Sequence, residues 1–184
     1  MTTTASTSAT STSTSASIAS TTAPVANARD LALAHYAARG VLEHVLALHG
    51  ITYQQQIALR AAITADGPQT PDELVAQVRG SLKADPADIR VTLDELLAKR
   101  LLAVDGAHLR ATDAGRELNA TVGAETAPVS ARIWGGIPSD DLVAAGRVLA
   151  LVAERADAEL AGWPTDRAAQ GSIRANSRVS GWKR

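Results

Sequence analysis

The sequence predicts a mainly α-helical protein: a winged helix-turn-helix with a short two-stranded β-hairpin wing and long helices at both ends. The first supporting observation is compositional. Phenylalanine is absent and aromatic residues make up 3% of the chain, so Leu, Val, Ile and Ala must build the core, which suits closely packed helices. The second is a series of helix-capping patterns along the chain. The third is one Asp-Gly pair between two short strand-like runs, a strong hairpin signal.

Two helices are expected before the helix-turn-helix. Asn27 and Asp30 form a capping pattern for the first helix, and Gly50 is expected to end it. Thr52 and Gln55 form a capping-box pattern for the second helix, which closes at the Asp-Gly-Pro sequence that follows it. Apolar residues recur at spacings of three and four in both segments, as in helices that bury one face.

The next two helices begin with the same motif. Residues 70–73 (Thr-Pro-Asp-Glu) and 85–88 (Asp-Pro-Ala-Asp) each combine a capping residue, a proline and an acid, and the two starts lie fifteen residues apart. Each helix is too short to be stable alone, so the caps matter. Two such helices can cross so that the start of the second, expected over residues 86–100, enters a DNA major groove.

A hairpin and a further helix follow. Residues 101–104 and 107–111 are predicted as the two strands, joined by Asp105-Gly106. Another helix is expected to start at Thr112, and Pro128 should kink or end it because proline lacks the backbone N–H that a helix needs.

The last helix is predicted to be capped by Ser139. One stripe of apolar residues follows at a spacing of about 3.5 residues, which is typical of a seam for a partner helix. The stripe consists of Leu142, Ala145, Leu149, Val152, Ala156 and Leu160.

Composition and charge exclude several functional classes. The formal net charge of −1 gives no bulk attraction to a polyanion. Cysteine is absent, which removes disulfides, thiolate catalysis and cysteine-ligated zinc. No apolar run approaches the roughly 20 residues of a membrane span, and no signal peptide is apparent. The expected compartment is therefore the cytoplasm, and no membrane partner is expected.

Motifs of catalysis or cofactor binding are also missing. The sequence has no glycine-rich phosphate loop, no Gly-x-Ser-x-Gly and no His-Glu-x-x-His. His44 and His49 lie five residues apart, which does not place two metal ligands on one helix face. We therefore expect no enzyme activity, no cofactor and no metal site.

The order and spacing of these motifs resemble the MarR (multiple antibiotic resistance regulator) family of bacterial transcription factors. Residues 85–102 are similar to its recognition-helix region, and residues 109–118 look like its Leu-Thr-x-x-Gly strand-to-helix signature. Residues 137–142 (Ile-Pro-Ser-Asp-Asp-Leu) look like the start of its last helix. The resemblance implies a homodimer that binds double-stranded DNA at a pseudo-palindromic operator. It also implies a small, often phenolic, effector bound between the dimerisation and DNA-binding regions.

The resemblance implies one folded domain between two tails. The Ser/Thr/Ala-rich N-terminal tail should be disordered because it cannot bury enough apolar surface. The C-terminal tail is basic and is expected to be flexible, or else to contact DNA phosphates. The expected tails cover residues 1–27 and 162–184, and the MarR-like domain covers residues 28–161. Within that domain, the DNA-binding part is expected at about 51–118 and the dimerisation helices at about 28–49 and 112–161.

The sequence also departs from the family pattern. Ala111 stands where the signature usually has Leu, and the predicted wing lacks a basic tip. The family often has a small hydroxyl residue at the place of Asp88 and a basic residue at the place of Val91. Residues 51–118 carry eight basic and ten acidic side chains, so the expected DNA-binding part is not basic.

Candidate DNA contacts follow from the predicted helix faces. A turn of 100° per residue places Ala87, Asp88, Val91, Asp94 and Glu95 outward on the recognition helix, with Arg90 at its flank. Asp88 could accept a hydrogen bond from cytosine N4, and Val91 could contact a thymine methyl group. Asp88 is equally an acid in the first turn of a helix, where it stabilises the helix. The other candidates are Thr70, Lys83, His108 and Arg110.

His35, Tyr36 and Trp134 are candidate ligand-binding residues because the family places its pocket near such positions. Each could equally be a helix-surface, core or interface residue.

The sequence leaves two functions open. The first is a DNA-binding transcriptional regulator. The second is a winged-helix protein-interaction or dimerisation module that has lost specific DNA binding. The acidic recognition helix and the reduced wing favour the second function.

Overall fold

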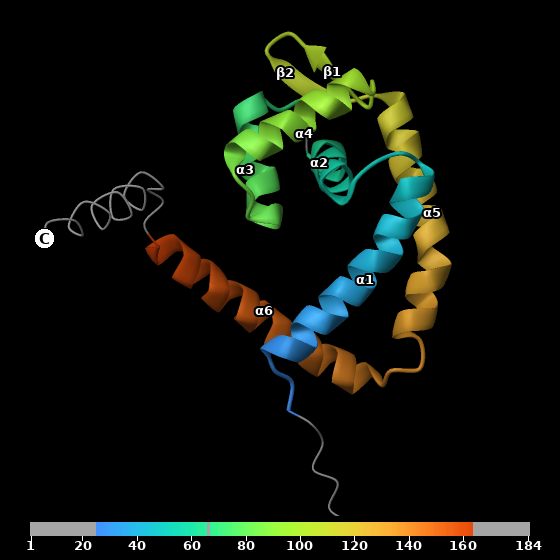
Figure 1. Ribbon diagram of the computed structural model, residues 1–184, viewed down its shortest axis with the longest axis vertical. Coiled ribbons are helices and arrows are strands. Elements are labelled where there is room, and N and C mark those ends of the chain that lie inside the picture. Colours follow the sequence, from blue (N-terminus) through green and yellow to red (C-terminus); the bar gives the residue numbers. More distant parts are fainter. Residues whose placement is uncertain (1–24, 66, 164–184) are drawn as a thin grey trace, which may run out of the picture. The chain divides into compact units, whose positions relative to one another are not determined.

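The structure is a computed structural model that describes residues 25–65 and 67–163. The tails expected over residues 1–27 and 162–184 lie almost entirely outside the described residues. Figure 1 shows the order of elements: α1 (Ala28–Leu48), α2 (Tyr53–Thr64), α3 (Pro71–Leu82), α4 (Pro86–Ala98), β1 (Leu102–Asp105), β2 (His108–Ala111), α5 (Asp113–Trp134) and α6 (Ser139–Gly162). This mainly α-helical arrangement with one hairpin confirms the predicted fold class.

The described chain divides into two compact units, with the division after Gly123. We call residues 25–123 the winged-helix unit and residues 124–163 the second unit, and each is described by itself. The winged-helix unit holds α1 to α4, the hairpin and the first half of α5. The second unit holds the rest of α5 and α6.

The predicted starts of the first three helices are confirmed. The Asn27 side chain accepts hydrogen bonds from two backbone N–H groups at the start of α1. The capping boxes of α2 and α3 are complete, with Thr52 and Gln55 in the first and Thr70 and Glu73 in the second. These bonds satisfy N–H groups that the first turn of a helix leaves without partners, each contributing about 1 kcal/mol.

One apolar core joins the elements of the winged-helix unit. The helix α2 contacts α3, α4 and β2, and α4 contacts β1. Burial of a Leu- or Ile-sized side chain contributes about 1.5–3 kcal/mol, so this core holds α4 in place. The largest fully buried side chains are Leu46, Leu59, Leu74, Val78, Ile89, Leu96, Leu102 and Val122.

The wing differs from the prediction by one residue. Asp105 belongs to β1 and pairs with His108, so the two-residue loop is Gly106-Ala107 rather than Asp105-Gly106. Gly106 has a φ of +61° at the first central position of the turn, which is the place of glycine in a type II′ turn. This register lets Leu109 bury its side chain beneath the wing.

The two long helices near the C-terminus also differ in detail from expectation. Pro128 does not end α5, which continues to Trp134. Ser139 was predicted to cap α6, but it is the first helical residue; Pro138 takes the capping position, and no side chain caps this end. Pro138 has a non-helical backbone (φ −56°, ψ 139°), and the helix begins one residue earlier than a cap at Ser139 would require.

Candidate nucleic-acid interface

The helix-turn-helix is formed by α3 and α4 with a three-residue connection. Lys83 ends α3 in the left-handed conformation, with a φ of +51°, and its backbone N–H donates to the carbonyl oxygen of Arg79. The Asp85 side chain then accepts a hydrogen bond of 2.9 Å from the backbone N–H of Ala87 at the start of α4. The sharp turn and the cap together set the direction in which α4 leaves α3.

The outer face of α4 is exposed, as the helix periodicity predicts. Ile89, Leu93 and Leu96 are buried against the core, and Ala87, Asp88 and Val91 point away from it. Val91 is 57% exposed, although it is an apolar residue at the centre of this face. Because the core fixes the opposite side of the helix, these three residues form a surface that a partner can reach.

A network of hydrogen bonds ties the far end of α4 to the first two helices. The Lys99 ammonium donates to the carbonyl oxygen of Gly50 and, over 3.0 Å, to Oε1 of Gln55. The amide nitrogen of Gln55 in turn donates to the Glu95 carboxylate over 2.6 Å. Gln55 is 3% exposed, so these bonds satisfy a buried amide that would be costly to leave without partners.

Two candidate arginines form ion pairs with exposed acids. Nη2 of Arg90 on α4 lies 3.0 Å from Oδ1 of Asp72 on α3. Nε of Arg110 lies 3.4 Å from Oδ2 of Asp105, diagonally across the wing. All four side chains are at least half exposed, so each pair contributes little to stability. The pairs do neutralise the two arginines that were expected to contact DNA.

The wing is also attached to the start of α3. The backbones of Gln69 and Leu109 exchange two hydrogen bonds, of 3.2 and 2.7 Å. This places His108 near Glu73, whose pKa is lowered by hydrogen bonds from the backbone and hydroxyl of Thr70 and, to a smaller extent, by the charge of His108. The hydroxyl of Thr70 is occupied in this capping box, so a DNA contact from Thr70 would have to share it.

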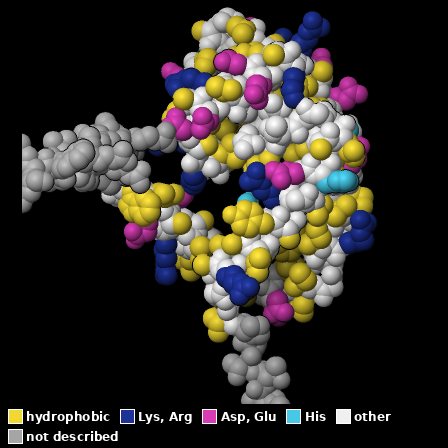
Figure 2. Space-filling view, viewed as in Figure 1, with side chains coloured by type: hydrophobic (Ala, Val, Ile, Leu, Met, Phe, Trp, Pro, Cys, Tyr) yellow, Lys and Arg dark blue, Asp and Glu magenta, His cyan; other side chains and the backbone are white. Residues whose placement is uncertain are grey.

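The charge distribution agrees with these pairs. On the face shown in Figure 2, acidic and basic side chains alternate over the winged-helix unit, and no extended basic patch forms there. The candidate DNA-binding residues therefore lie at the two ends of α3, on α4 and on the wing, without a basic surface around them on this face.

The expected ligand-binding residues belong to two different units. His35 and Tyr36 lie on α1, with their rings in an edge-on contact at 5.5 Å, and both line a mostly apolar hollow of about 350 Å³. Ala28, Leu31 and Ala32 complete its lining. Trp134, the third candidate, belongs to the second unit and is 55% exposed. Its part in a ligand site stays a prediction.

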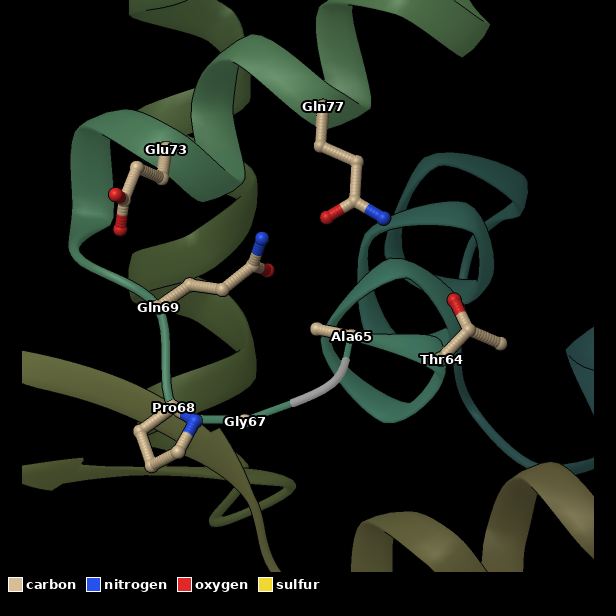
Figure 3. A pocket seen from close by; sticks show the side chains of 7 residues that line it. All are labelled: Thr64, Ala65, Gly67, Pro68, Gln69, Glu73 and Gln77. Carbon is tan, nitrogen blue, oxygen red and sulfur yellow. The ribbon is translucent and has the colours of Figure 1, made fainter.

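A second, polar hollow was not anticipated from the sequence. It has a volume of about 590 Å³ and lies between the end of α2 and the start of α3. Figure 3 shows the side-chain amides of Gln69 and Gln77 directed into it. Oε1 of Gln69 is buried and has no hydrogen-bond partner. Only the Asp-Gly-Pro sequence before α3 pointed to an irregular segment at this place.

Two kinds of feature do not occur among the residues that the structure describes. No cluster of three His, Asp or Glu side chains suited to a metal ion occurs in the described ranges. None of the helices described is long and apolar enough to cross a bilayer.

Solved structures share this arrangement. A MarR-family regulator from Rhodococcus sp. RHA1 is 21% identical over 67% of this chain and 90% of its own, with a TM-score of 0.57. CouR from Rhodococcus jostii RHA1, bound to p-coumaroyl-CoA, is 21% identical over 67% of this chain and 88% of its own, with a TM-score of 0.57.

A similar match comes from a second genus. MarR from Staphylococcus aureus, in complex with salicylate and kanamycin, is 19% identical over 71% of this chain and 90% of its own, with a TM-score of 0.62. No family model and no curated protein matches the sequence. The helix order, the capped helix-turn-helix and these structural matches together show that the chain has the winged-helix fold of MarR-family transcriptional regulators.

Proposed function

We propose that this protein is a DNA-binding transcriptional regulator of the MarR type that binds a pseudo-palindromic operator as a homodimer. The observation that carries the proposal is α4, a capped helix with its inner side in the core and its outer side exposed. Backbone N–H groups at the start of such a helix attract phosphate, and its first residues reach base edges when it lies in the major groove. The similar structures are regulators rather than enzymes.

The homodimer is supported by apolar surface on the second unit. No residue of α6 is buried, although the helix carries a regular apolar stripe. Such a stripe is stable in water when it packs against a partner helix. We infer that a second copy of the chain covers it. Its exposed large members are Leu149, Val152 and Leu160.

Dimerisation would place two recognition helices in successive major grooves, about 34 Å apart. A small aromatic effector that changed this spacing would release the operator. Two observations support this part of the proposal. The apolar hollow beside His35 and Tyr36 offers aromatic and apolar contacts, and two of the similar structures hold p-coumaroyl-CoA or salicylate.

Selection of bound duplexes from a random pool tests the proposal. The full chain should enrich a pseudo-palindromic sequence with half-sites one helical turn apart. The variant Val91→Glu, which places a further charge at the centre of the outer face of α4, should lose the enrichment while it folds and dimerises normally. If the wild-type protein enriches no sequence at low salt, the regulator proposal is refuted.

The second candidate function is a protein-interaction module on the same fold. The specific observation in its favour is the neutralised and partly acidic interface, in which Asp72 and Asp105 pair with Arg90 and Arg110. A module of this kind would bind duplexes equally and weakly. The variant Arg90→Ala would then leave partner binding intact, whereas in a DNA-binding regulator it would reduce operator affinity.

A further inference from the structure

The outer face of α4 offers an acceptor and a methyl-bearing surface rather than positive charge. The Asp88 carboxylate is exposed in the first turn, and among the described residues no hydrogen bond or ion pair engages it; only its backbone carbonyl accepts, from the Thr92 hydroxyl. Val91 follows one turn later with 57% of its surface exposed. Both groups are therefore available to a base edge.

The two arginines near this face, Arg90 and Arg110, differ from Asp88 and Val91 because each is held in an ion pair. A guanine contact uses a guanidinium that donates two hydrogen bonds to O6 and N7. Arg90, beside this face, already donates from Nη2 to Asp72, and Arg110 on the wing is paired with Asp105. Of the outward side chains Ala87, Asp88 and Val91, Asp88 carries the hydrogen-bond acceptor and Val91 the largest apolar group.

We propose that the recognition helix reads a cytosine through Asp88 and a neighbouring thymine methyl group through Val91 in each operator half-site. This inference rests on the proposed DNA-binding function and adds the base composition of the site. In the major groove, cytosine presents its N4 amino group as a donor, which a carboxylate accepts, and thymine presents a methyl group, which an apolar side chain contacts.

The spacing of the two side chains fits this assignment. Residues at positions i and i+3 of a helix have their side chains about 5–6 Å apart on one face. Successive base pairs are about 3.4 Å apart along the duplex axis. Asp88 and Val91 therefore reach base pairs that are one or two steps apart, so the cytosine and the thymine should lie within the same short stretch of the half-site.

The first experiment compares the sequences enriched from a random pool by wild-type protein, Asp88→Asn and Asp94→Asn. Asparagine prefers adenine N6 and N7, so Asp88→Asn should change one half-site position from cytosine to adenine, with a preference of about tenfold. Asp94→Asn is the matched control, because it removes one exposed acid from the same helix, further from its start. It should leave the preferred bases unchanged.

The second experiment removes the thymine methyl group itself. Replacement of the selected thymine by uracil should weaken wild-type binding several-fold and should have little effect on the Val91→Ala variant. Far-UV circular dichroism and sedimentation of each variant confirm that it is folded and has the wild-type oligomeric state.

The outcomes separate this inference from the function on which it rests. If wild-type protein enriches no sequence, both fall together. If it enriches an operator whose half-site lacks the cytosine, or if Asp88→Asn and Asp94→Asn select the same bases as wild-type protein, the DNA-binding function stands and the assignment of Asp88 is overturned. Equal effects of uracil on wild-type protein and Val91→Ala overturn the assignment of Val91.

Discussion

Replacement of Gly115 by alanine is expected to destabilise the winged-helix unit, because this glycine packs directly against backbone. A Cβ atom at Gly115 would lie 2.3 Å from the carbonyl oxygen of Leu101 and 3.0 Å from Cδ1 of Leu59. Real Cβ atoms essentially never come within 3.0 Å of such a neighbour. The close approach gives a physical reason for the glycine in the Thr112-x-x-Gly115 sequence.

The size of the effect follows from what must move. The Leu101 carbonyl oxygen accepts hydrogen bonds from the backbone N–H and the hydroxyl of Thr112, at 3.1 and 3.2 Å. Overpacking of this kind costs about 1–3 kcal/mol, and each weakened hydrogen bond costs about 1 kcal/mol more. The higher helix propensity of alanine offsets about 1 kcal/mol. We expect a net loss of about 2 kcal/mol in the free energy of unfolding.

Urea and thermal unfolding, followed by far-UV circular dichroism at one protomer concentration, measure this loss. For a chain of this size, about 2 kcal/mol corresponds to a fall in Tm of about 4–8 °C. Gly123→Ala is the matched control on the same helix, since a Cβ atom there meets nothing within 4 Å. It should raise stability by up to about 1 kcal/mol. The reasoning is refuted if Gly115→Ala is as stable as Gly123→Ala.

Three further predictions concern the charge of the interface, the pH dependence of stability and the proline inside α5. Asp72→Asn, which releases Arg90 from its ion pair, should strengthen binding to any duplex several-fold and steepen the loss of log K with log salt by up to about 1; fluorescence anisotropy at several salt concentrations measures both, and weaker binding would contradict the argument. Because Thr70 lowers the pKa of Glu73, the stabilisation from this carboxylate is complete above about pH 4.3 and is lost as the pH falls through the lower folded pKa. The stability advantage of wild-type protein over Glu73→Gln, measured by urea unfolding from about pH 6 to about pH 3, should therefore shrink in acid, and a constant difference would count against it. Pro128→Ala restores a backbone N–H inside α5 and should stabilise the helix by up to about 3 kcal/mol; an unchanged Tm would show that α5 is not continuous there.

The sequence by itself determined where the helices of the winged-helix unit begin, which side of α4 faces the core, and that a hairpin follows it. The helix caps are local: the capping boxes at Thr52 and Thr70 and the N-cap at Asp85 join residues only two or three positions apart. The exposure of Val91 follows from helix periodicity. These features could be predicted because each depends on a short stretch of chain with its own conformational preferences.

Only the tertiary structure decided the register of the wing and the partners of the candidate DNA-binding residues. The wing is aligned by the pairing of Gln69 with Leu109 and by the burial of Leu109, not by its turn residues alone. Arg90 meets Asp72 across 18 positions of sequence, and Lys99 meets Gly50 across 49. Such contacts depend on how α2, α3 and α4 pack on one core, and no local preference specifies which distant acid or carbonyl that packing brings within reach.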